Sequence, residues 1–253
     1  MITINGTEIT ELTYNGVEIE KALCNGVVVF EKKRENIIRM KTSADSINLR
    51  VTTKDGSPRE LWNDGKKIAE MQSDTYQTVS IQNNAEEITI KGYDIQELDC
   101  DNNRLTTLNI SGCTSLRQLV CFNNKLTTLN ASGCTSLQWL DCSNNQLTTL
   151  NASGCTSLQW LYCDNNKLIS LDVSGCTSLQ RLDCNNNKLS AEVFKKLFED
   201  LPERKEKDGR VLLYKDGDSN YKDFTQPPEL AAAFKAAKEK GWKFYKNNWS
   251  TEI

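Results

Sequence analysis

Residues 116–136 read LRQLVCFNNKLTTLNASGCTS, and this 21-residue pattern decides the fold. The pattern restarts at Leu137, Leu158 and Leu179, and a degenerate first copy begins at Ile95, so five copies follow one another. A fixed period of this length is typical of a solenoid, in which no single copy can bury its own apolar side chains. The sequence therefore predicts a stack of five rungs over residues 95–189.

Equivalent residues of successive copies form columns, which become ladders because neighbouring rungs lie about 4.8 Å apart. Leucine columns, such as that of Leu119 and Leu140, predict a core that exists only as a stack. Another column holds only asparagine, whose amide can bond the backbone of a turning chain and of the rungs above and below. Its members are Asn103, Asn124, Asn145, Asn166 and Asn187.

Nine of the ten cysteines occupy two further columns, which alternate with leucine at inward positions. They are Cys100, Cys121, Cys142, Cys163 and Cys184, and Cys113, Cys134, Cys155 and Cys176. A buried thiol behaves as a small apolar group, and the absence of histidine and of Cys-x-x-Cys pairs removes the usual zinc spacings. Stacked thiols have parallel Cβ vectors, so a relaxed disulfide would require the backbone to move. We therefore expect free structural thiols, no metal site, and folding in a reducing compartment. Cys24, outside the repeat, has no assigned role.

The repeat resembles the leucine-rich-repeat family, and most closely its short bacterial class, in which Leu-x-x-Leu-x-Cys-x-x-Asn-x-Leu-Thr-x-Leu-x-x-Ser-x-Cys-Thr-x recurs. The resemblance covers residues 95–189. It implies a horseshoe to which each copy contributes one strand. The predicted fold class is an α+β solenoid, with β-rich N-terminal segments, about five repeats and an α/β C-terminal cap.

Residues 1–32 carry Asn5-Gly6, Asn15-Gly16 and Asn25-Gly26 between β-prone runs, which predicts a small β-meander because Asn-Gly favours tight hairpin turns. This segment resembles the short units that open some phage tail and prophage-encoded proteins. That resemblance implies docking to a larger assembly.

Residues 33–94 contain four alternating stretches that predict strands, and we expect them to cover the apolar end of the first rung. The stretches are residues 37–40, 47–51, 78–81 and 88–90. Residues 190–253 resemble the C-terminal caps of short bacterial leucine-rich-repeat proteins. There we expect a helix from Ser190 to Pro202, a strand at 211–214, a helix at 228–240 and a last strand at 242–245.

The composition disfavours several classes of partner. The formal net charge is −3 with 26% charged residues, so no basic field attracts nucleic acid or an anionic membrane. No run approaches the roughly 18 apolar residues of a membrane helix. Residues 1–6 lack a basic and apolar leader, so we expect no secretion signal in this chain, although a trimmed chain would look the same. The sequence does not determine where the protein is located after folding, and display on a virion or cell surface is one alternative.

Positions that differ between copies indicate where function lies, because stacking constrains the framework columns. Residues 127–140 and 148–161 are identical, whereas the outward positions of the strands mix aromatic, acidic and basic residues. Contiguous exposed aromatic side chains mark interaction sites, and Trp, Tyr and Arg dominate binding energies. In a horseshoe these outward positions form the concave face. We therefore predict that the concave face binds a protein or a glycan. The candidate residues are Val120, Phe122, Trp139, Asp141, Trp160, Tyr162, Asp164, Arg181 and Asp183.

The alternative is that the tryptophans only stack on one another and add about 0.5 kcal/mol each to the sheet. Under the binding hypothesis, replacing Trp139 and Trp160 by alanine abolishes binding and leaves thermal stability nearly unchanged. Under the alternative, the same change lowers stability.

Other polar groups give weaker signals. The column of Arg104, Lys125, Gln146, Lys167 and Lys188 is basic in four of five copies and is expected to be a solvated edge rather than an anion site. Residues 216–223 have the spacing of a calcium loop but lack its central glycine and terminal glutamate, so we expect no calcium.

No enzyme activity and no cofactor are expected. The chain has no histidine for a nucleophile–base pair and no glycine-rich phosphate loop. A carboxylate pair such as Asp141 and Asp164 could serve a glycosidase, but carboxylates on an open sheet should stay solvated and ionised. The sequence therefore predicts a non-enzymatic binding protein. The alternative is a structural phage or cell-surface component that docks through residues 1–32.

Overall fold

The computed structural model describes residues 3–4, 7–8, 12–14, 17–19, 21–24, 27–31, 35–81, 87–206 and 208–253. The chain forms two compact units, residues 1–35 and residues 36–253. The boundary therefore falls three residues after the predicted one.

The first unit contains three short antiparallel hairpins. They pair β1 (Thr3–Ile4) with β2 (Thr7–Glu8), β3 (Thr13–Tyr14) with β4 (Val17–Glu18), and β5 (Lys21–Cys24) with β6 (Val27–Glu31). The described strands form separate pairs, whereas the sequence predicted one meander. The three Asn-Gly dipeptides and the side chain of Cys24 lie outside the described residues.

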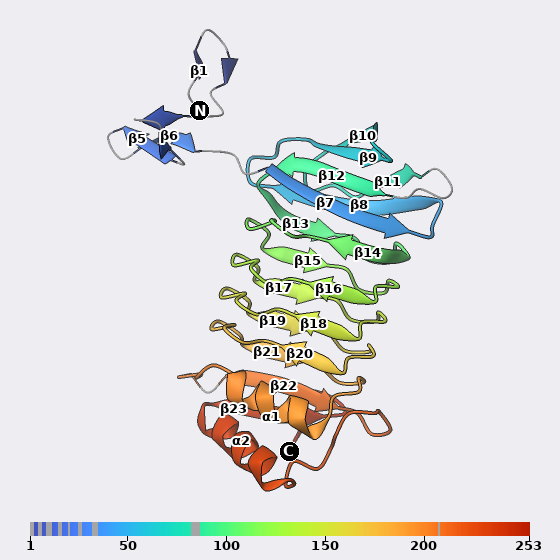
Figure 1. The fold of residues 1–253 in the computed structure, drawn as a ribbon, viewed down its shortest axis with the longest axis vertical. Coiled ribbons are helices and arrows are strands. Elements are labelled where there is room, and N and C mark those ends of the chain that lie inside the picture. The colour runs from blue at the N-terminus through green and yellow to red at the C-terminus, as the bar shows by residue number, and fades with distance from the viewer. Residues whose placement is uncertain are drawn as a thin grey trace. The chain divides into compact units, whose positions relative to one another are not determined.

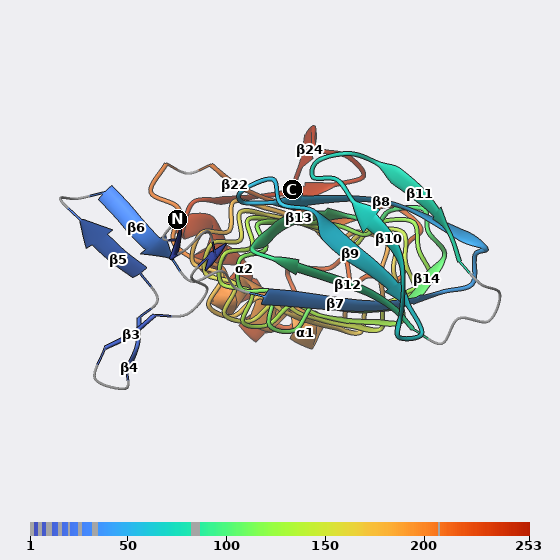
Figure 2. The same cartoon turned by 90° about the horizontal axis from the view of Figure 1, so that it is seen from above.

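The second unit begins with six strands that feed two sheets. The strands are β7 (Glu35–Thr42), β8 (Ser46–Thr53), β9 (Arg59–Asn63), β10 (Lys66–Met71), β11 (Gln77–Ser80) and β12 (Ile88–Tyr93). Strand β7 pairs with β14 (Leu105–Asn109), and β8 pairs with β13 (Ile95–Asp99), so this segment continues both sides of the first repeat. Figure 2 looks along the stack and shows β7 and β8 on opposite sides of the core.

The repeats stack as parallel rungs in register, with each copy shifted by 21 residues from the one before (Figure 1). One side is formed by β13, β15 (Gln118–Val120), β17 (Trp139–Asp141), β19 (Trp160–Tyr162) and β21 (Arg181–Asp183). The other is formed by β14, β16 (Thr128–Asn130), β18 (Thr149–Asn151) and β20 (Ser170–Asp172). The leucine columns between the two sides are buried, as the stacking argument requires.

The asparagine column bonds successive rungs as the sequence predicted. The Asn145 Oδ1 accepts from Leu126 N at 3.0 Å, while its Nδ2 donates to the carbonyls of Cys121 and Cys142. The preceding asparagine of each copy, such as Asn144 with φ 52°, adopts the left-handed conformation that turns the chain. Asparagine tolerates that conformation better than most residues, so the Asn-Asn pair supplies both the turn and its hydrogen bonds.

The nine repeat cysteines are buried free thiols. Several donate weak hydrogen bonds to a neighbouring rung, as from Cys163 Sγ to Asp183 O at 3.3 Å and from Cys155 Sγ to Ala131 O at 3.1 Å. Burial raises the pKa of every one of them, to about 12 for Cys113, Cys155 and Cys176. These thiols therefore stay protonated near neutral pH and act as packing groups.

The C-terminal segment continues the sheet and adds both helices. It comprises α1 (Ala191–Asp200), β22 (Gly209–Tyr214), α2 (Pro228–Glu239), β23 (Trp242–Lys246) and β24 (Thr251–Glu252). Ser190 accepts from Val193 N and caps α1, and Phe198 packs against Phe224 and Phe244 in an aromatic core. Strands β22 and β23 extend the repeat side in parallel, which gives the ten-stranded order β11-β8-β13-β15-β17-β19-β21-β22-β23-β24. In the described part of the chain, no helix has the length and apolarity to cross a membrane.

Candidate binding face

Two columns of side chains follow the outward side of the ten-stranded sheet. Strand register aligns Gln118, Trp139, Trp160 and Arg181 in one column and Val120, Asp141, Tyr162 and Asp183 in the other. Phe122 and Asp164 follow their strands at positions of the same parity, so they lie on the same side. All nine predicted residues thus share one surface, which we call the aromatic face. The leucines between them, such as Leu140, are buried in the core.

The aromatic side chains at the centre of this face pack on one another. The ring centroids of Trp139 and Trp160 are 5.5 Å apart with planes tilted by 44°, and Trp139 lies 5.3 Å from Tyr162. This mutual packing leaves all three outward-facing rings half-buried. The cluster is therefore both a stabilising ladder and an accessible apolar surface.

The carboxylates of the face are less solvated than the sequence suggested. Asp183 is 7% exposed, and burial together with the nearby charge of Asp164 raises its pKa to about 7. Burial also raises the pKa of Asp141 and of Asp164. The expectation that these carboxylates stay solvated, with nothing to raise a pKa, is therefore wrong, because burial removes water from them.

Local hydrogen bonds fix the two carboxylates of the second column. Asp141 Oδ1 accepts from Ser143 N at 3.1 Å and from Ser143 Oγ at 2.7 Å. Asp183 Oδ1 accepts from the backbone N–H of Asn185 at 3.3 Å and from its side-chain amide. A carboxyl group that is partly protonated near neutral pH can also donate a hydrogen bond to a partner.

The face extends beyond the repeats at its N-terminal end, which the sequence did not predict. Arg50 on β8 lies opposite Asp99, and its Nη1 donates to Asp74 Oδ1 at 2.8 Å and to Glu97 Oε2 at 3.3 Å. The hydroxyl of Tyr76 donates to Asp99. No local motif marks Arg50 or Tyr76, because only the antiparallel pairing of β8 with β13 brings them here.

An aromatic side chain from the C-terminal segment lies at the C-terminal end of the aromatic face. Trp249 folds back so that the Arg181 guanidinium carbon lies 3.8 Å from the centroid of its ring, and it also contacts Tyr245. The same guanidinium lies 5.6 Å from the Tyr162 centroid. Sequence reasoning missed Trp249, since it lies outside the repeat.

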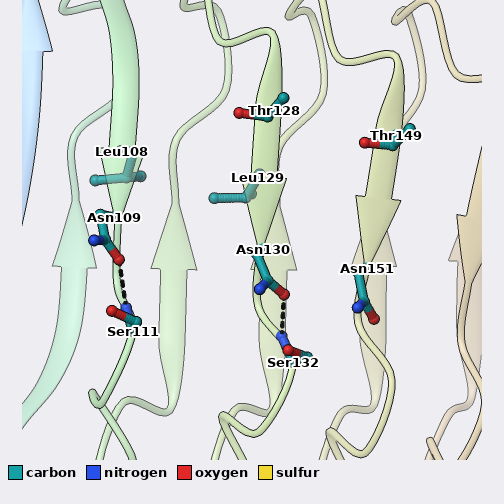
Figure 3. A pocket seen from close by; sticks show the side chains of 9 residues that line it. All are labelled: Leu108, Asn109, Ser111, Thr128, Leu129, Asn130, Ser132, Thr149 and Asn151. Carbon is teal, nitrogen blue, oxygen red and sulfur yellow. Dashed lines mark hydrogen bonds between the residues drawn. The ribbon is translucent and has the colours of Figure 1, made fainter.

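A shallow pocket of about 370 Å³ lies on the opposite side of the stack (Figure 3). It is lined by uncharged side chains from three successive rungs, where Asn109 Oδ1 accepts from Ser111 N and Asn130 Oδ1 from Ser132 N. Because these rungs have nearly identical sequences, the pocket repeats the framework and adds no distinctive group.

The remaining polar candidates are exposed or already engaged. The five side chains of the basic column, Arg104, Lys125, Gln146, Lys167 and Lys188, are exposed. In the segment with calcium-like spacing, the Asp218 carboxylate accepts from the backbone N–H groups of Asn186, Lys215 and Asn220. That carboxylate therefore organises the turn after β22.

Comparisons with known proteins match the repeat region. The model of a single leucine-rich repeat matches residues 136–158, and the model of two leucine-rich repeats matches residues 156–196. Among solved structures, the functional domain of InlJ from Listeria monocytogenes, described as including a cysteine ladder, is similar with 27% identity and a TM-score of 0.42. The alignment covers 51% of this chain and 27% of that chain. No curated protein matches. The family models do not reach residues 1–32, so the phage-tail resemblance stays a prediction.

Proposed function

We propose that this chain, whose residues 136–196 are leucine-rich repeats, is a non-enzymatic module that binds a protein partner through the aromatic face. The observation that supports this proposal is the half-buried cluster of Trp139, Trp160 and Tyr162 at the centre of that face. Aromatic anchors surrounded by charged groups are the usual centres of binding energy. Solenoids present such residues on an extended surface because each rung contributes to it.

The geometry of the rings favours a protein over a glycan. A sugar stacks best on an open, flat ring, whereas the two tryptophan planes are tilted by 44° and each ring is half-buried. Such an uneven apolar surface fits the varied side chains of a polypeptide. The carboxylates and Arg181 around the cluster supply hydrogen-bonding groups that orient the partner.

The test uses a random-peptide display library selected on the intact chain, followed by fluorescence anisotropy with the selected peptides. The double variant Trp139→Ala/Trp160→Ala should weaken peptide binding by about tenfold or more. The matched control is Tyr93→Ala, which removes an exposed ring of β12, in the other sheet, and should leave binding unchanged.

Thermal unfolding of the same variants separates binding from stability. The loss of the ring packing should lower stability by about 0.5–1.5 kcal/mol per ring pair, so a folded variant that no longer binds supports the proposal. Peptide binding that survives the double variant contradicts it. Binding of the intact chain to a glycan array, with no peptide selected, would favour the glycan alternative instead.

A further inference from the structure

The strand register continues the first column of the aromatic face into the C-terminal segment. Arg181 on β21 is opposite Arg210 on β22, which is opposite Lys243 on β23. All three strands are parallel neighbours, so these side chains lie on the same side as Trp139 and Trp160. One column therefore presents two tryptophans followed by three cations on successive rungs. We call the three cations the cationic column.

In the part of the chain that the structure describes, no carboxylate pairs with the cationic column. None of Arg181, Arg210 and Lys243 forms an ion pair with any carboxylate in the described ranges. Like charges on directly opposite strand positions repel one another at a spacing of about 4.8 Å. Arg210 and Lys243 are exposed, and the Arg181 Nε is buried without a hydrogen-bond partner. The three side chains therefore remain available to pair with an anionic group of a partner.

Arg181 is already held in place for such an anion. Its guanidinium stacks on Trp249 at 3.8 Å and lies near Tyr162, which restricts its rotamers before any partner arrives. Asp183, on the same strand, forms no ion pair with Arg181, and its Oδ1 accepts from Asn185. A pre-ordered guanidinium loses less conformational entropy when it pairs with a carboxylate.

We propose that the partner presents an acidic peptide segment whose carboxylates bind the cationic column, beside an apolar side chain that packs on Trp139 and Trp160. This rests on the proposed function, in which the aromatic face binds a protein. The far end of the face is different, since Arg50 there is already paired with Asp74 and Glu97. The unpaired cations therefore fix the direction in which the partner lies across the face.

The peptides selected on the intact chain provide the test. They should be enriched in Asp and Glu, and their affinity should fall as NaCl rises from about 0.05 to about 0.5 M because salt screens exposed charges. The double variant Arg210→Glu/Lys243→Glu should weaken their binding by about tenfold or more. The control Lys167→Glu/Lys188→Glu makes the same change of charge at two exposed sites of the basic column and should have less than about a twofold effect.

The outcomes separate this inference from the proposed function. Peptides that require Trp139 and Trp160 but are not acidic, or that bind Arg210→Glu/Lys243→Glu normally, overturn the inference and leave the proposed function standing. An equal loss in both double charge variants also overturns it, since the effect would then be one of net charge. If no selected peptide depends on the tryptophans, the proposed function itself fails.

Discussion

At the scale of single residues, the columns of the repeat predicted burial correctly wherever stacking alone decides it. Nine thiols and four of the five asparagines of the column lie inside because every rung repeats the same inward position, and Asn166 is partly buried. Burial of Asp183 was not predictable in this way. It depends on which side chains of adjacent rungs cover the carboxylate, and those positions vary between copies.

The raised pKa of Asp183 predicts a stability that changes with pH. The folded state holds its proton up to about pH 7, whereas in the unfolded chain the carboxyl group has its ordinary pKa of 3.8. Between these values the folded state binds more protons, so stability falls as pH rises from about 4 to about 7. The raised pKa values of Asp141 and Asp164 act in the same direction.

We therefore expect Asp183→Asn to stabilise the protein at pH 8 and to flatten this pH dependence, because the neutral amide carries no buried charge. Urea unfolding at a series of pH values measures both effects. The matched control is Asp223→Asn, since hydrogen bonds from Thr225 lower the pKa of the exposed Asp223. The control should not stabilise the protein at pH 8. Equal stabilities of the wild-type protein and Asp183→Asn at pH 8 would contradict the raised pKa of Asp183.

At the scale of elements, many helix and strand positions followed from local signals, but strand partners did not. Strands β9 and β10 and the second strand of each repeat, such as β16, were not predicted. Ser190 and Pro202 bracket α1 as predicted, and residues 37–40 and 47–51 lie inside β7 and β8. The hairpin of β9 and β10 carries its turn at Asp64-Gly65. The pairing of β8 with β13 and of β21 with β22 joins segments without a shared motif, so Arg50, Arg210 and Trp249 could not be assigned to the face.

One residue links the last repeat to the C-terminal segment. Asn220 Oδ1 accepts from Leu189 N at 2.9 Å, and its Nδ2 donates to the carbonyls of Cys184 and Leu213. Asn220 therefore continues the asparagine column in a part of the chain that has no repeat. At the first repeat the roles are reversed, because the side chain of Asn103 accepts from Asn48 N and donates to Asn48 O on β8.

Replacing Asn220 by alanine should loosen the junction between these elements. It removes the acceptor of the buried Leu189 N–H and the Asn220 donor of the Leu213 carbonyl, whereas the Cys184 carbonyl keeps the donor Asn187 Nδ2. The unsatisfied N–H costs about 1–3 kcal/mol. Hydrogen exchange should accelerate at the Leu189 amide and in β22. Ser219→Ala, at the exposed neighbouring position, serves as the control and should leave exchange at Leu189 unchanged. Protection of that amide in Asn220→Ala would mean that other contacts hold the junction.

At the scale of the whole molecule, residues 36–253 form one unit although the sequence suggested three segments there. The ten-stranded sheet passes from β11 through the repeats to β24, so flanks and repeats share one hydrogen-bonded layer. Because each rung is stable only against its neighbours, we infer that both flanks act as caps on the stack.

Two truncations test this inference, one that removes a separate unit and one that removes a cap. Removal of residues 1–35 should leave the thermal unfolding of residues 36–253 unchanged, since those residues make up a separate unit. Removal of residues 190–253 should instead abolish cooperative unfolding and cause aggregation. It exposes the buried Leu182 and Leu189 and removes the Leu212 carbonyl that accepts from Cys184 N at 3.1 Å. Circular dichroism and size-exclusion chromatography measure both results. A soluble, cooperatively folded chain that ends at Leu189 would show that the repeats need no cap.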